Sequence, residues 1–358
     1  MNYYLAFAMS LVLSLILTII TKKIALKLKI VDQPDQTRKM HEKTTPLLGG
    51  MAIFLSFFTV IFLFKNNILS GSLELHHWLG VFVGAIFLMI GGLLDDKYKL
   101  NPKLQLIFPI LACLSVVAGG VGIEKITGIS GNLVFLNDLR IPIIAWAGQI
   151  HYFIILADLF TIIWLMGMMY TTKLLDGVDG LVSGVTAIGS FIIFLFTMTT
   201  KYFQPDIGFA ALVLCASCLG FLILNWQPAK IFLGEGGSLL LGYLLGVLSI
   251  ISGGKIAIAL LIMGIPIMDV AWTILRRTIA GKNPFRSADR KHLHFRLLDS
   301  GLSVKKTVLF YYLFALIFGL SALFLQSNGK FVLLLVLLLI MTGIIFLFSW
   351  LDRKSRIG

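Results

Sequence analysis

The sequence predicts an all-α integral membrane protein, with about eleven transmembrane helices in a single polytopic domain over residues 1–358. Of the 358 residues, 58% are hydrophobic and 13% are charged, which is more apolar surface than a soluble core can bury. The apolar residues also fall into separate runs, each long enough to cross ~30 Å of hydrocarbon as a helix. Acidic pairs, histidines and Gly-rich turns lie mostly in alternate gaps between these runs, so we expect an active site at one membrane interface.

Eleven apolar runs follow one another along the chain. We expect the first to be a retained span and not a signal peptide, because positive charge follows it and no small-residue cleavage site comes after it. The longest outer gap, residues 122–152, holds Gly and Asn turns around short β-branched stretches, which predict a small extracytoplasmic β-hairpin. The runs are Tyr4–Ile20, Pro46–Phe64, Trp78–Leu94, Leu104–Val121, Phe153–Thr171, Leu181–Thr199, Ile207–Leu224, Gly236–Gly253, Ile256–Ile274, Val308–Leu325 and Phe331–Leu351.

Positive charge is distributed unevenly between alternate gaps. All but six of the 30 Lys and Arg residues lie in the odd-numbered gaps and at the C-terminus. Because cytoplasmic loops retain positive charge, we expect the N-terminus outside and the C-terminus in the cytoplasm. The net charge of +13 then belongs to the cytoplasmic face, where it suits anionic membrane lipids and anionic substrates. No soluble basic domain exists to bind nucleic acid. The cytoplasmic loops are expected at about residues 22–45, 95–103, 172–180, 225–235 and 275–307.

Carboxylates gather in three of these loops. Asp95 and Asp96 stand side by side where the third run ends, which calls for a compensating cation or metal. Asp176 and Asp179 are three residues apart, so they would share one face if this stretch formed the first turn of the next helix. Glu235 stands in a Gly-rich turn that opens the eighth run and offers backbone N–H groups to phosphate and a carboxylate to Mg²⁺. Each motif alone also fits a span end, a helix cap or an ordinary turn between helices.

Two other cytoplasmic loops are basic. One carries Arg290, Lys291, His292, His294 and Arg296, and the first loop carries Arg38, Lys39 and His41. Clusters of this composition bind phosphate, although a solvated loop that satisfies the positive-inside rule is the alternative. Zinc is not expected, because no Cys/His set has ligand spacing and all three cysteines lie inside apolar runs. Oxygen ligands from several loops suit Mg²⁺ held together with substrate phosphates.

These motifs resemble those of the polyprenyl-phosphate N-acetylhexosamine-1-phosphate transferases, a membrane family of the glycosyltransferase family 4 type. The basic histidine stretch is closer to the undecaprenyl-phosphate GlcNAc-1-phosphate branch than to the phospho-MurNAc-pentapeptide branch. The resemblance runs from Arg38 to about Ser303. Its motifs, in order, are Arg38-Lys39-x-His41 with Pro46 and Gly49-Gly50; Asp95-Asp96 with Lys103; Asp176-Gly177-x-Asp179-Gly180; Phe232-x-Gly234-Glu235-x-Gly237-Ser238; Pro266-Ile267-Met268-Asp269; and Asp289-Arg290-Lys291-His292-Leu293-His294-x-Arg296-Leu297.

The resemblance implies a phosphoglycosyl transferase. It would transfer N-acetylhexosamine 1-phosphate, from UDP-GlcNAc or a related UDP-N-acetylhexosamine, to polyprenyl (undecaprenyl) phosphate and release UMP. This step, at the cytoplasmic face of a bacterial inner (plasma) membrane, initiates a cell-envelope polysaccharide such as lipopolysaccharide or a cell-wall polymer. The implied cofactor is Mg²⁺ or Mn²⁺, and a second copy of this chain is a candidate partner.

The same resemblance implies roles for individual residues. A phosphate monoester has its second pKa near ~6, so the lipid phosphate is largely dianionic and Asp95 and Asp96 are expected to position it and to compensate charge. A covalent aspartyl intermediate remains open. The implied catalytic residues are Asp95, Asp96, Asp176, Asp179 and His292; the metal ligands are Asp179 and Glu235; and the substrate contacts are Arg38, Lys39, His41, Lys103, Arg290, Lys291, His294 and Arg296.

Three positions depart from the pattern of this family. It usually has Asn where Lys173 stands, Asp where Glu235 stands and His where Phe295 stands. Lys173 has no acceptor, so it cannot ligate a metal as an Asn carbonyl can. These departures keep a second hypothesis open, a catalytically degenerate relative that binds polyprenyl phosphate or nucleotide sugar as a regulator or scaffold. A transporter is disfavoured, because only Asp158 and Asp269 lie within predicted spans.

Overall fold

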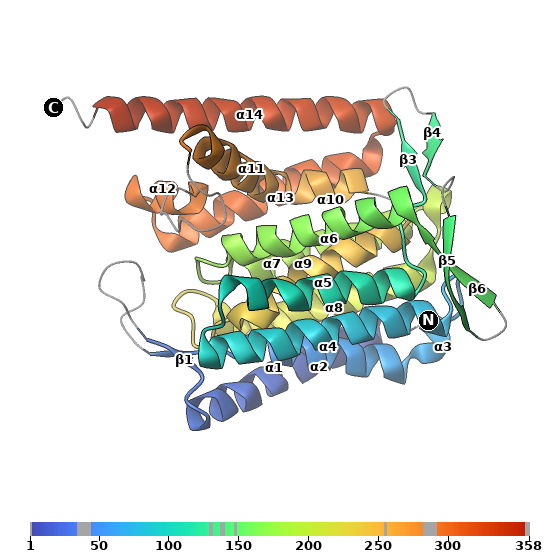
Figure 1. The fold of residues 1–358 in the computed structure, drawn as a ribbon. Helices are drawn as coiled ribbons and strands as arrows, with labels where there is room; N and C mark the ends of the chain where they lie inside the picture. Colours follow the sequence, from blue (N-terminus) through green and yellow to red (C-terminus); the bar gives the residue numbers. More distant parts are fainter. Residues whose placement is uncertain are drawn as a thin grey trace.

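The computed structural model describes residues 2–33, 44–128, 132–136, 140–146, 149–253, 256–281 and 292–354. Most of the described helices lie side by side in one bundle (Figure 1). The elements are α1 (Tyr3–Lys27), β1 (Val31–Asp32), β2 (Thr45–Pro46), α2 (Gly49–Leu63), α3 (Lys65–Ile68), α4 (Leu75–Tyr98), α5 (Pro102–Ala118), β3 (Lys125–Thr127), β4 (Leu133–Phe135), β5 (Arg140–Trp146), β6 (Gln149–Ile154), α6 (Ile155–Leu175), α7 (Leu181–Thr197), a 3₁₀ turn (Thr200–Tyr202), α8 (Pro205–Asn225), α9 (Gly234–Ile251), α10 (Ile256–Ile262), α11 (Gly264–Ile279), α12 (Leu293–Asp299), α13 (Val304–Phe324) and α14 (Ser327–Lys354).

The length and apolarity of the helices confirm a mostly helical, multi-pass membrane protein. In the described chain, 7 helices are long and apolar enough to cross a membrane, and the count reaches 8 if the bent pair α10 and α11 forms one span. Helices α2, α5 and α7 are also apolar but shorter, at 15, 17 and 17 residues. The expected number of eleven spans therefore stays a prediction.

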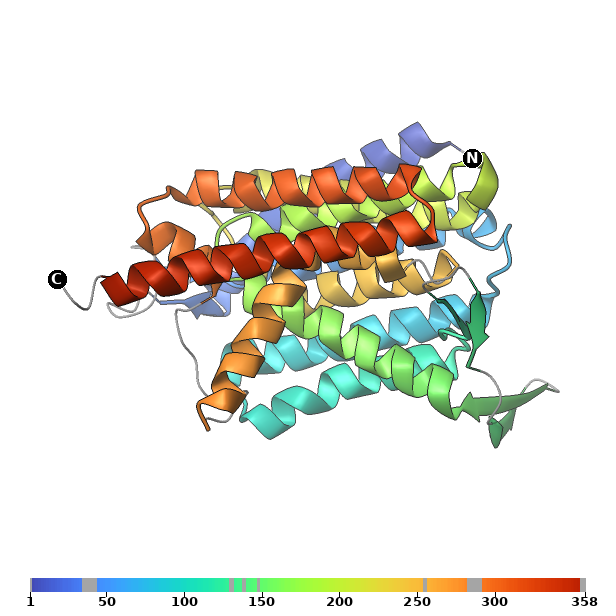
Figure 2. The same ribbon diagram turned by 90° about the horizontal axis from the view of Figure 1, so that it is seen from above.

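The ninth predicted span is not one continuous helix. The prediction of a single helix over Ile256–Ile274 is wrong, because α10 and α11 meet at an angle of 80°. Pro266 lies three residues into α11, and its ring removes the N–H that would bond to the Ile262 carbonyl one turn earlier. Figure 2 shows α11 crossing its neighbours obliquely. This direction brings the middle of α11 next to α12.

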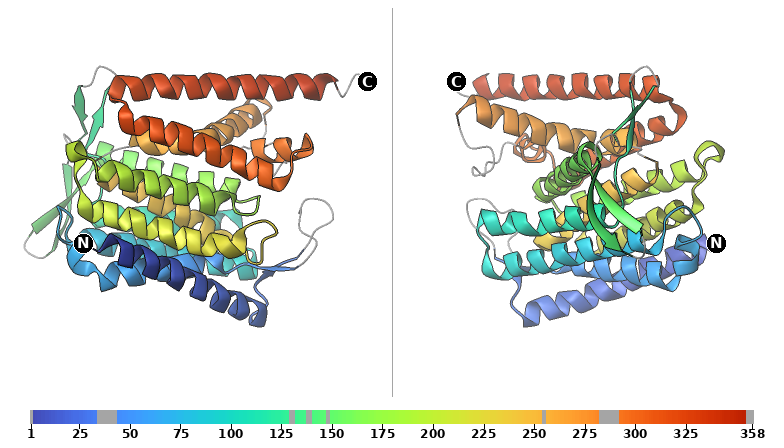
Figure 3. Two further views of the ribbon diagram at one scale, coloured as in Figure 1. Left: turned by 180° about the vertical axis from the view of Figure 1, so that it is seen from behind. Right: turned by 45° about the vertical axis from the view of Figure 1, so that its right-hand side comes forward.

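The helix ends gather at two opposite ends of the bundle. The N-terminus and strands β3–β6 lie at one end, whereas β1, α12 and the C-terminal end of α14 lie at the other (Figure 3). The connections from α4 to α5, from α6 to α7 and from α8 to α9 lie at this second end, which we call the loop end (Figure 1). All three acidic motifs therefore share one end of the bundle. Which side of the membrane this end faces stays a prediction.

Close glycine contacts hold α9 against α2 and α4 near the loop end. A Cβ atom at Gly92 would lie 2.1 Å from the Gly236 Cα, and one at Gly50 would lie 2.1 Å from the Gly237 Cα. Small residues let helix backbones approach closely, which is the main source of packing between helices in lipid. The Gly-rich turn at the start of α9 therefore has a second function, because Gly236 and Gly237 also pack α9 against α4 and α2.

The strands form short antiparallel pairs. Between α5 and α6, β3 pairs with β4 and β5 pairs with β6, with Arg140 opposite Ile154 and an irregularity at Pro142. At the loop end, β1 pairs with β2 and places Val31 opposite Pro46. The predicted substrate contacts Arg38, Lys39 and His41 fall between β1 and β2, outside the described residues.

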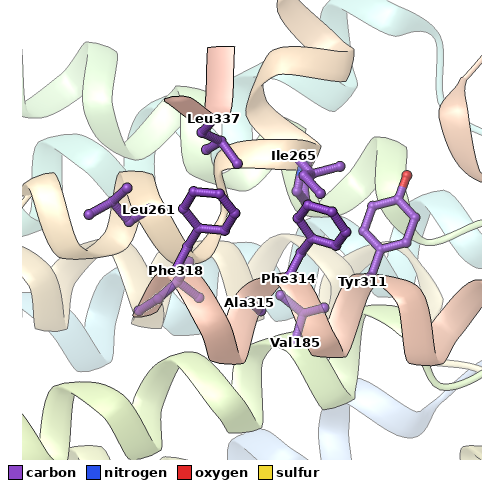
Figure 4. A pocket seen from close by; sticks show the side chains of 10 residues that line it. Val185, Leu261, Ile265, Tyr311, Phe314, Ala315, Phe318 and Leu337 are labelled. Carbon is purple, nitrogen blue, oxygen red and sulfur yellow. The ribbon is translucent and has the colours of Figure 1, made fainter. Parts of the chain in front are cut away.

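An apolar pocket lies beside the bend between α10 and α11 (Figure 4). It is lined by Val185 of α7, Leu261 of α10, Phe314 and Phe318 of α13, and Leu337 of α14, among others. Its lining contains no acidic or basic side chain. The chemistry therefore has to be sought at the loop end.

Candidate active site

Asp95 closes the C-terminal end of α4. Its Oδ1 accepts the Leu100 N–H at 2.8 Å and a Gln105 Nε2–H at 2.9 Å. Lys99, at the C-cap, has a φ of 52°, so the chain leaves α4 in a left-handed turn that brings Leu100 back to Asp95. Asp95 therefore fixes the junction of α4 with α5, a structural function that the sequence did not reveal.

Asp96 joins α4 to the first turn of α9. Both of its carboxylate oxygens lie 3.2 Å from the Glu235 backbone nitrogen, whose N–H they accept. Gly234 has a φ of +75°, and a Cβ there would lie 2.5 Å from Asp96 Oδ2 and 2.2 Å from the Leu47 carbonyl oxygen. An anion at a helix N-terminus is stabilised by the unpaired N–H groups and the helix dipole. Glycine at 234 thus allows Asp96 to cap α9.

Lys173 connects the acidic motifs of two helices. In the last turn of α6, its ammonium forms an ion pair with Glu235 of α9 and donates to Gln105 Oε1 at 3.2 Å. Gln105 in turn donates to Asp95, so one chain of polar contacts runs from α9 through α6 and α5 to α4. Gln105 was absent from the predicted site. Only one signal in the sequence could have identified it. Gln105 is a polar residue near the start of an apolar run, four residues after the Asn101 cap of α5.

Asp176 and Asp179 lie in a turn between α6 and α7. Helix α7 begins at Leu181, where the predicted span also begins, and Gly180 before it has a φ of +76°, so the two acids do not share a first helical turn. Asp179 accepts the Ala229 N–H at 2.9 Å and so ties this turn to the loop before α9. Burial and neighbouring carboxylates, first that of Glu235, raise the pKa of Asp176 to about 8. Part of Asp176 is open to solvent, and water there moderates the repulsion.

The histidines of the basic cluster reach the same turn. His292, at the N-cap of α12, places Nδ1 2.9 Å from Asp269 Oδ2 of α11. The ring of His294 lies parallel to that of His292, with 5.7 Å between centroids. A Cβ built at Gly177, between the two aspartates, would lie 3.0 Å from His294 Nε2. The α12 histidines and the Asp176 turn therefore form one site.

His294 is fully buried and uncharged. Neither of its ring nitrogens has a hydrogen-bond partner within the described ranges, and burial lowers its pKa to about 3. A buried ring nitrogen without a partner costs free energy, so each nitrogen needs a partner such as water, an ion or a substrate group. His294 is thus suited to contact a substrate as a neutral ring.

The remaining predicted basic residues are dispersed or fall outside the described parts of the chain. Lys103 is exposed in the first turn of α5. The Arg296 guanidinium lies over the ring of Phe348 on α14, 5.9 Å from its centroid. Arg290 and Lys291 belong to a segment that the structure does not describe. Their predicted contacts with substrate stay predictions.

The acidic cluster does not fit a preformed magnesium site. Its carboxylates are hard oxygen ligands of the kind that Mg²⁺ prefers. However, Lys173 pairs with Glu235, and Asp96 and Asp179 each hold a backbone N–H. In the portion of the chain that is described, no group of three or more His, Cys, Asp or Glu side chains could hold a metal ion. The expectation of Mg²⁺ or Mn²⁺ therefore stays a prediction.

Fold and site together define a multi-pass membrane protein with a carboxylate- and histidine-lined site at one end of its helical bundle. Comparison with known proteins agrees with this class. A model described as "Glycosyl transferase family 4" matches residues 78–253. A Bacillus subtilis protein named probable undecaprenyl-phosphate N-acetylglucosaminyl 1-phosphate transferase is 34% identical over 328 residues, 90% of this chain and 84% of its own length. The chain belongs to glycosyl transferase family 4.

Two other relatives widen the comparison. The undecaprenyl-phosphate alpha-N-acetylglucosaminyl 1-phosphate transferase of Thermotoga maritima is 28% identical over 345 residues, 96% of this chain and 97% of its own. A phospho-N-acetylmuramoyl-pentapeptide-transferase of Listeria monocytogenes is 32% identical over 272 residues, 74% of this chain and 79% of its own. The relatives of this chain thus include proteins named for both the GlcNAc-1-phosphate branch and the phospho-MurNAc-pentapeptide branch.

Proposed function

We propose that this protein is a phosphoglycosyl transferase that moves N-acetylglucosamine 1-phosphate from UDP-GlcNAc to a polyprenyl phosphate such as undecaprenyl phosphate. The observation that carries the proposal is the convergence of the α4, α6–α7 and α9 acids with the α12 histidines at one end of a membrane bundle. The names of the relatives supply the substrate class. We place the helical bundle in a bacterial inner membrane, with the loop end in the cytoplasm as the distribution of positive charge predicts.

The reaction needs positioning more than proton transfer. An oxygen of the lipid phosphate attacks the phosphorus attached to the sugar, and the bond from that phosphorus to the UMP oxygen breaks. The attacking oxygen is already ionised at neutral pH, because the second pKa of a phosphate monoester is near ~6. Asp96 holds the N-terminus of α9 in place, and Asp176 and Asp179 border the turn that His294 contacts. His294, as a neutral ring, and His292 then face the transferred phosphoryl group.

The test is transfer of radiolabelled sugar phosphate from UDP-GlcNAc to undecaprenyl phosphate by the purified protein in detergent, with added Mg²⁺ and with EDTA. We expect product from the wild type and a loss of at least ~100-fold in Asp176→Ala, because the Asp176 carboxyl, with its pKa raised to about 8, can donate a hydrogen bond to a phosphoryl oxygen, and losing one such donor costs about 10²–10³-fold. Glu124→Gln, an exposed carboxylate at the opposite end of the bundle, is the matched control and should keep full activity.

A second function is favoured by one observation, the ion pair between Lys173 and Glu235. A protein whose metal-binding carboxylate is neutralised by lysine could bind nucleotide sugar or polyprenyl phosphate without turnover, as a regulator or scaffold. Binding of UDP-GlcNAc without product from any UDP-N-acetylhexosamine would support this function. The same preparation, examined by size in detergent, tests the expected homodimer.

A further inference from the structure

We propose that the Lys173 ammonium is a resident cation that binds the diphosphate of the nucleotide sugar, so that this protein holds its donor without a divalent metal at Glu235. The inference rests on the proposed function, since it assigns the donor to this site. It concerns two residues, Lys173 and Gln105, that neither the motifs nor the comparisons assign to a role.

The position of Lys173 suits a phosphate ligand. It lies on the last turn of α6, three residues before Asp176, and its side chain is 21% exposed. The ammonium therefore lies at the surface of the acidic cluster, where a ligand can reach it. It also lies 5.5 Å from the centroid of the Tyr170 ring on the same helix. An aromatic face attracts an ammonium, so Tyr170 and Glu235 together hold the Lys173 ammonium in place.

Two protein acceptors fix the ammonium and leave one donor for a ligand. Glu235 and Gln105 Oε1 each take one of the three N–H groups of Lys173. The Gln105 amide is itself oriented, because its Nε2 donates to Asp95 Oδ1 at 2.9 Å and to the Leu100 carbonyl at 3.0 Å. The third N–H group has no polar partner among the residues that the structure describes. An oriented ammonium loses less side-chain freedom when it binds phosphate than a mobile one does.

The number of carboxylates in the site favours such a cation. Five carboxylates belong to one polar network or act on one another's ionisation, and they are Asp95, Asp96, Asp176, Asp179 and Glu235. A diphosphate would bring further negative charge to this surface. Like charges at this separation repel unless a cation lies between them. Lys173 is tethered between these acids, whereas a dissolved metal ion must first displace it.

The same ion pair opposes metal binding. A divalent ion at Glu235 would meet a lysine ammonium at ion-pair distance and would have to break that pair to gain an oxygen ligand. The protein therefore favours the covalently attached cation over a dissociable one at this position. Removing the charge of Lys173 should free the Glu235 carboxylate for a metal.

The experiment measures binding by the purified full-length protein in detergent, apart from turnover. UDP binding is followed by calorimetry in EDTA and in Mg²⁺, and Mn²⁺ binding without nucleotide is followed by electron paramagnetic resonance. We expect wild-type UDP affinity to change less than about threefold on adding EDTA, whereas Lys173→Asn should lose about tenfold or more in EDTA, the effect of one hydrogen bond to a charged group. Lys173→Asn should also bind Mn²⁺ about tenfold more tightly than the wild type, because its Glu235 carboxylate is no longer paired.

Two further variants keep the test decisive. Lys97→Asn removes a charge from an exposed lysine at the same end of the bundle and should behave as the wild type. Lys173→Arg keeps the charge and the ion pair and should bind UDP in EDTA even if Lys173→Asn folds poorly.

Two results would overturn the proposal. One is equal UDP affinity of wild type and Lys173→Asn in EDTA; the other is loss of UDP binding by both the wild type and Lys173→Arg when EDTA is added. If the wild type still makes lipid-linked product in either case, the proposed function stands and only the role of Lys173 fails. A wild type that neither binds UDP nor forms product contradicts both.

Discussion

The contact between His292 and Asp269 shows how single residues prepare the site. Asp269 accepts the Leu293 N–H at 3.0 Å through Oδ1 and contacts His292 Nδ1 through Oδ2. A carboxylate at Nδ1 places a proton there and directs Nε2 outward, where it can meet a phosphate oxygen. Asp269 is therefore a positioning residue. The sequence identified it as part of a motif but gave it no role.

We expect Asp269→Asn to lower kcat by at least about tenfold, because an amide does not hold the imidazole in the same tautomer and orientation. KM for the UDP-sugar should change much less, since Asp269 acts through His292. Steady-state kinetics of the purified variant separate the two parameters. The control is Asp299→Asn, which changes an exposed acid at the end of α12, the helix that His292 caps. Equal losses in both variants would contradict a specific role for Asp269.

At the scale of elements, the site depends on how closely α4 and α9 approach each other. Gly92 and Gly236 lie in backbone contact, and Asp96, one turn further along α4, then reaches the first N–H groups of α9. The acidic cluster is thus a consequence of helix packing. A side chain placed between the two helices should separate the acids as well as weaken the bundle.

Gly92→Ala is expected to destabilise the protein by about 1–3 kcal/mol, the usual cost of overpacking, and to lower activity by displacing Asp96. Gly167→Ala is the matched control, because a Cβ at Gly167 of α6 meets no atom within 4 Å. Thermal unfolding in detergent should show a lower Tm for Gly92→Ala only. An unchanged Tm would mean that α4 and α9 are not held by this contact.

At the scale of the whole molecule, the bundle separates two chemically different ends. The loop end collects the three acidic motifs, the α12 histidines and the connections richest in lysine and arginine, and strands β3–β6 lie at the opposite end (Figure 1). A transferase whose donor is a cytoplasmic nucleotide sugar needs the loop end inside the cell. The distribution of charge predicts that orientation.

Cysteine labelling of intact cells tests the orientation. Glu124→Cys should react with a membrane-impermeant maleimide from outside, whereas Lys97→Cys should react only after permeabilisation. The parent protein is a suitable background, because Cys113, Cys215 and Cys218 are all buried and should stay unlabelled. Labelling of Lys97→Cys in intact cells would invert the proposed topology.

The sequence by itself determined the class of the protein and predicted the chemistry of its site. Lipid requires long apolar helices, so each predicted run corresponds to described helical structure, and the residue types of the motifs predict which acids and histidines belong to the site. The positions of Arg38, Lys39, His41, Arg290 and Lys291 lie outside the described residues, so their roles stay predictions.

Only the tertiary structure decided which of these residues meet. The 80° bend between α10 and α11 directs α11 so that Asp269 meets His292, and the left-handed Gly180 keeps Asp176 and Asp179 in a loop before α7. The contact of Lys173 with Gln105 depends on α5 lying beside α6, and a sequence separation of 68 residues hides it. Hydropathy along the sequence predicts which segments form membrane helices, because the bilayer requires each spanning segment to be apolar by itself. Polar contacts between helices depend on packing, which involves all segments at once.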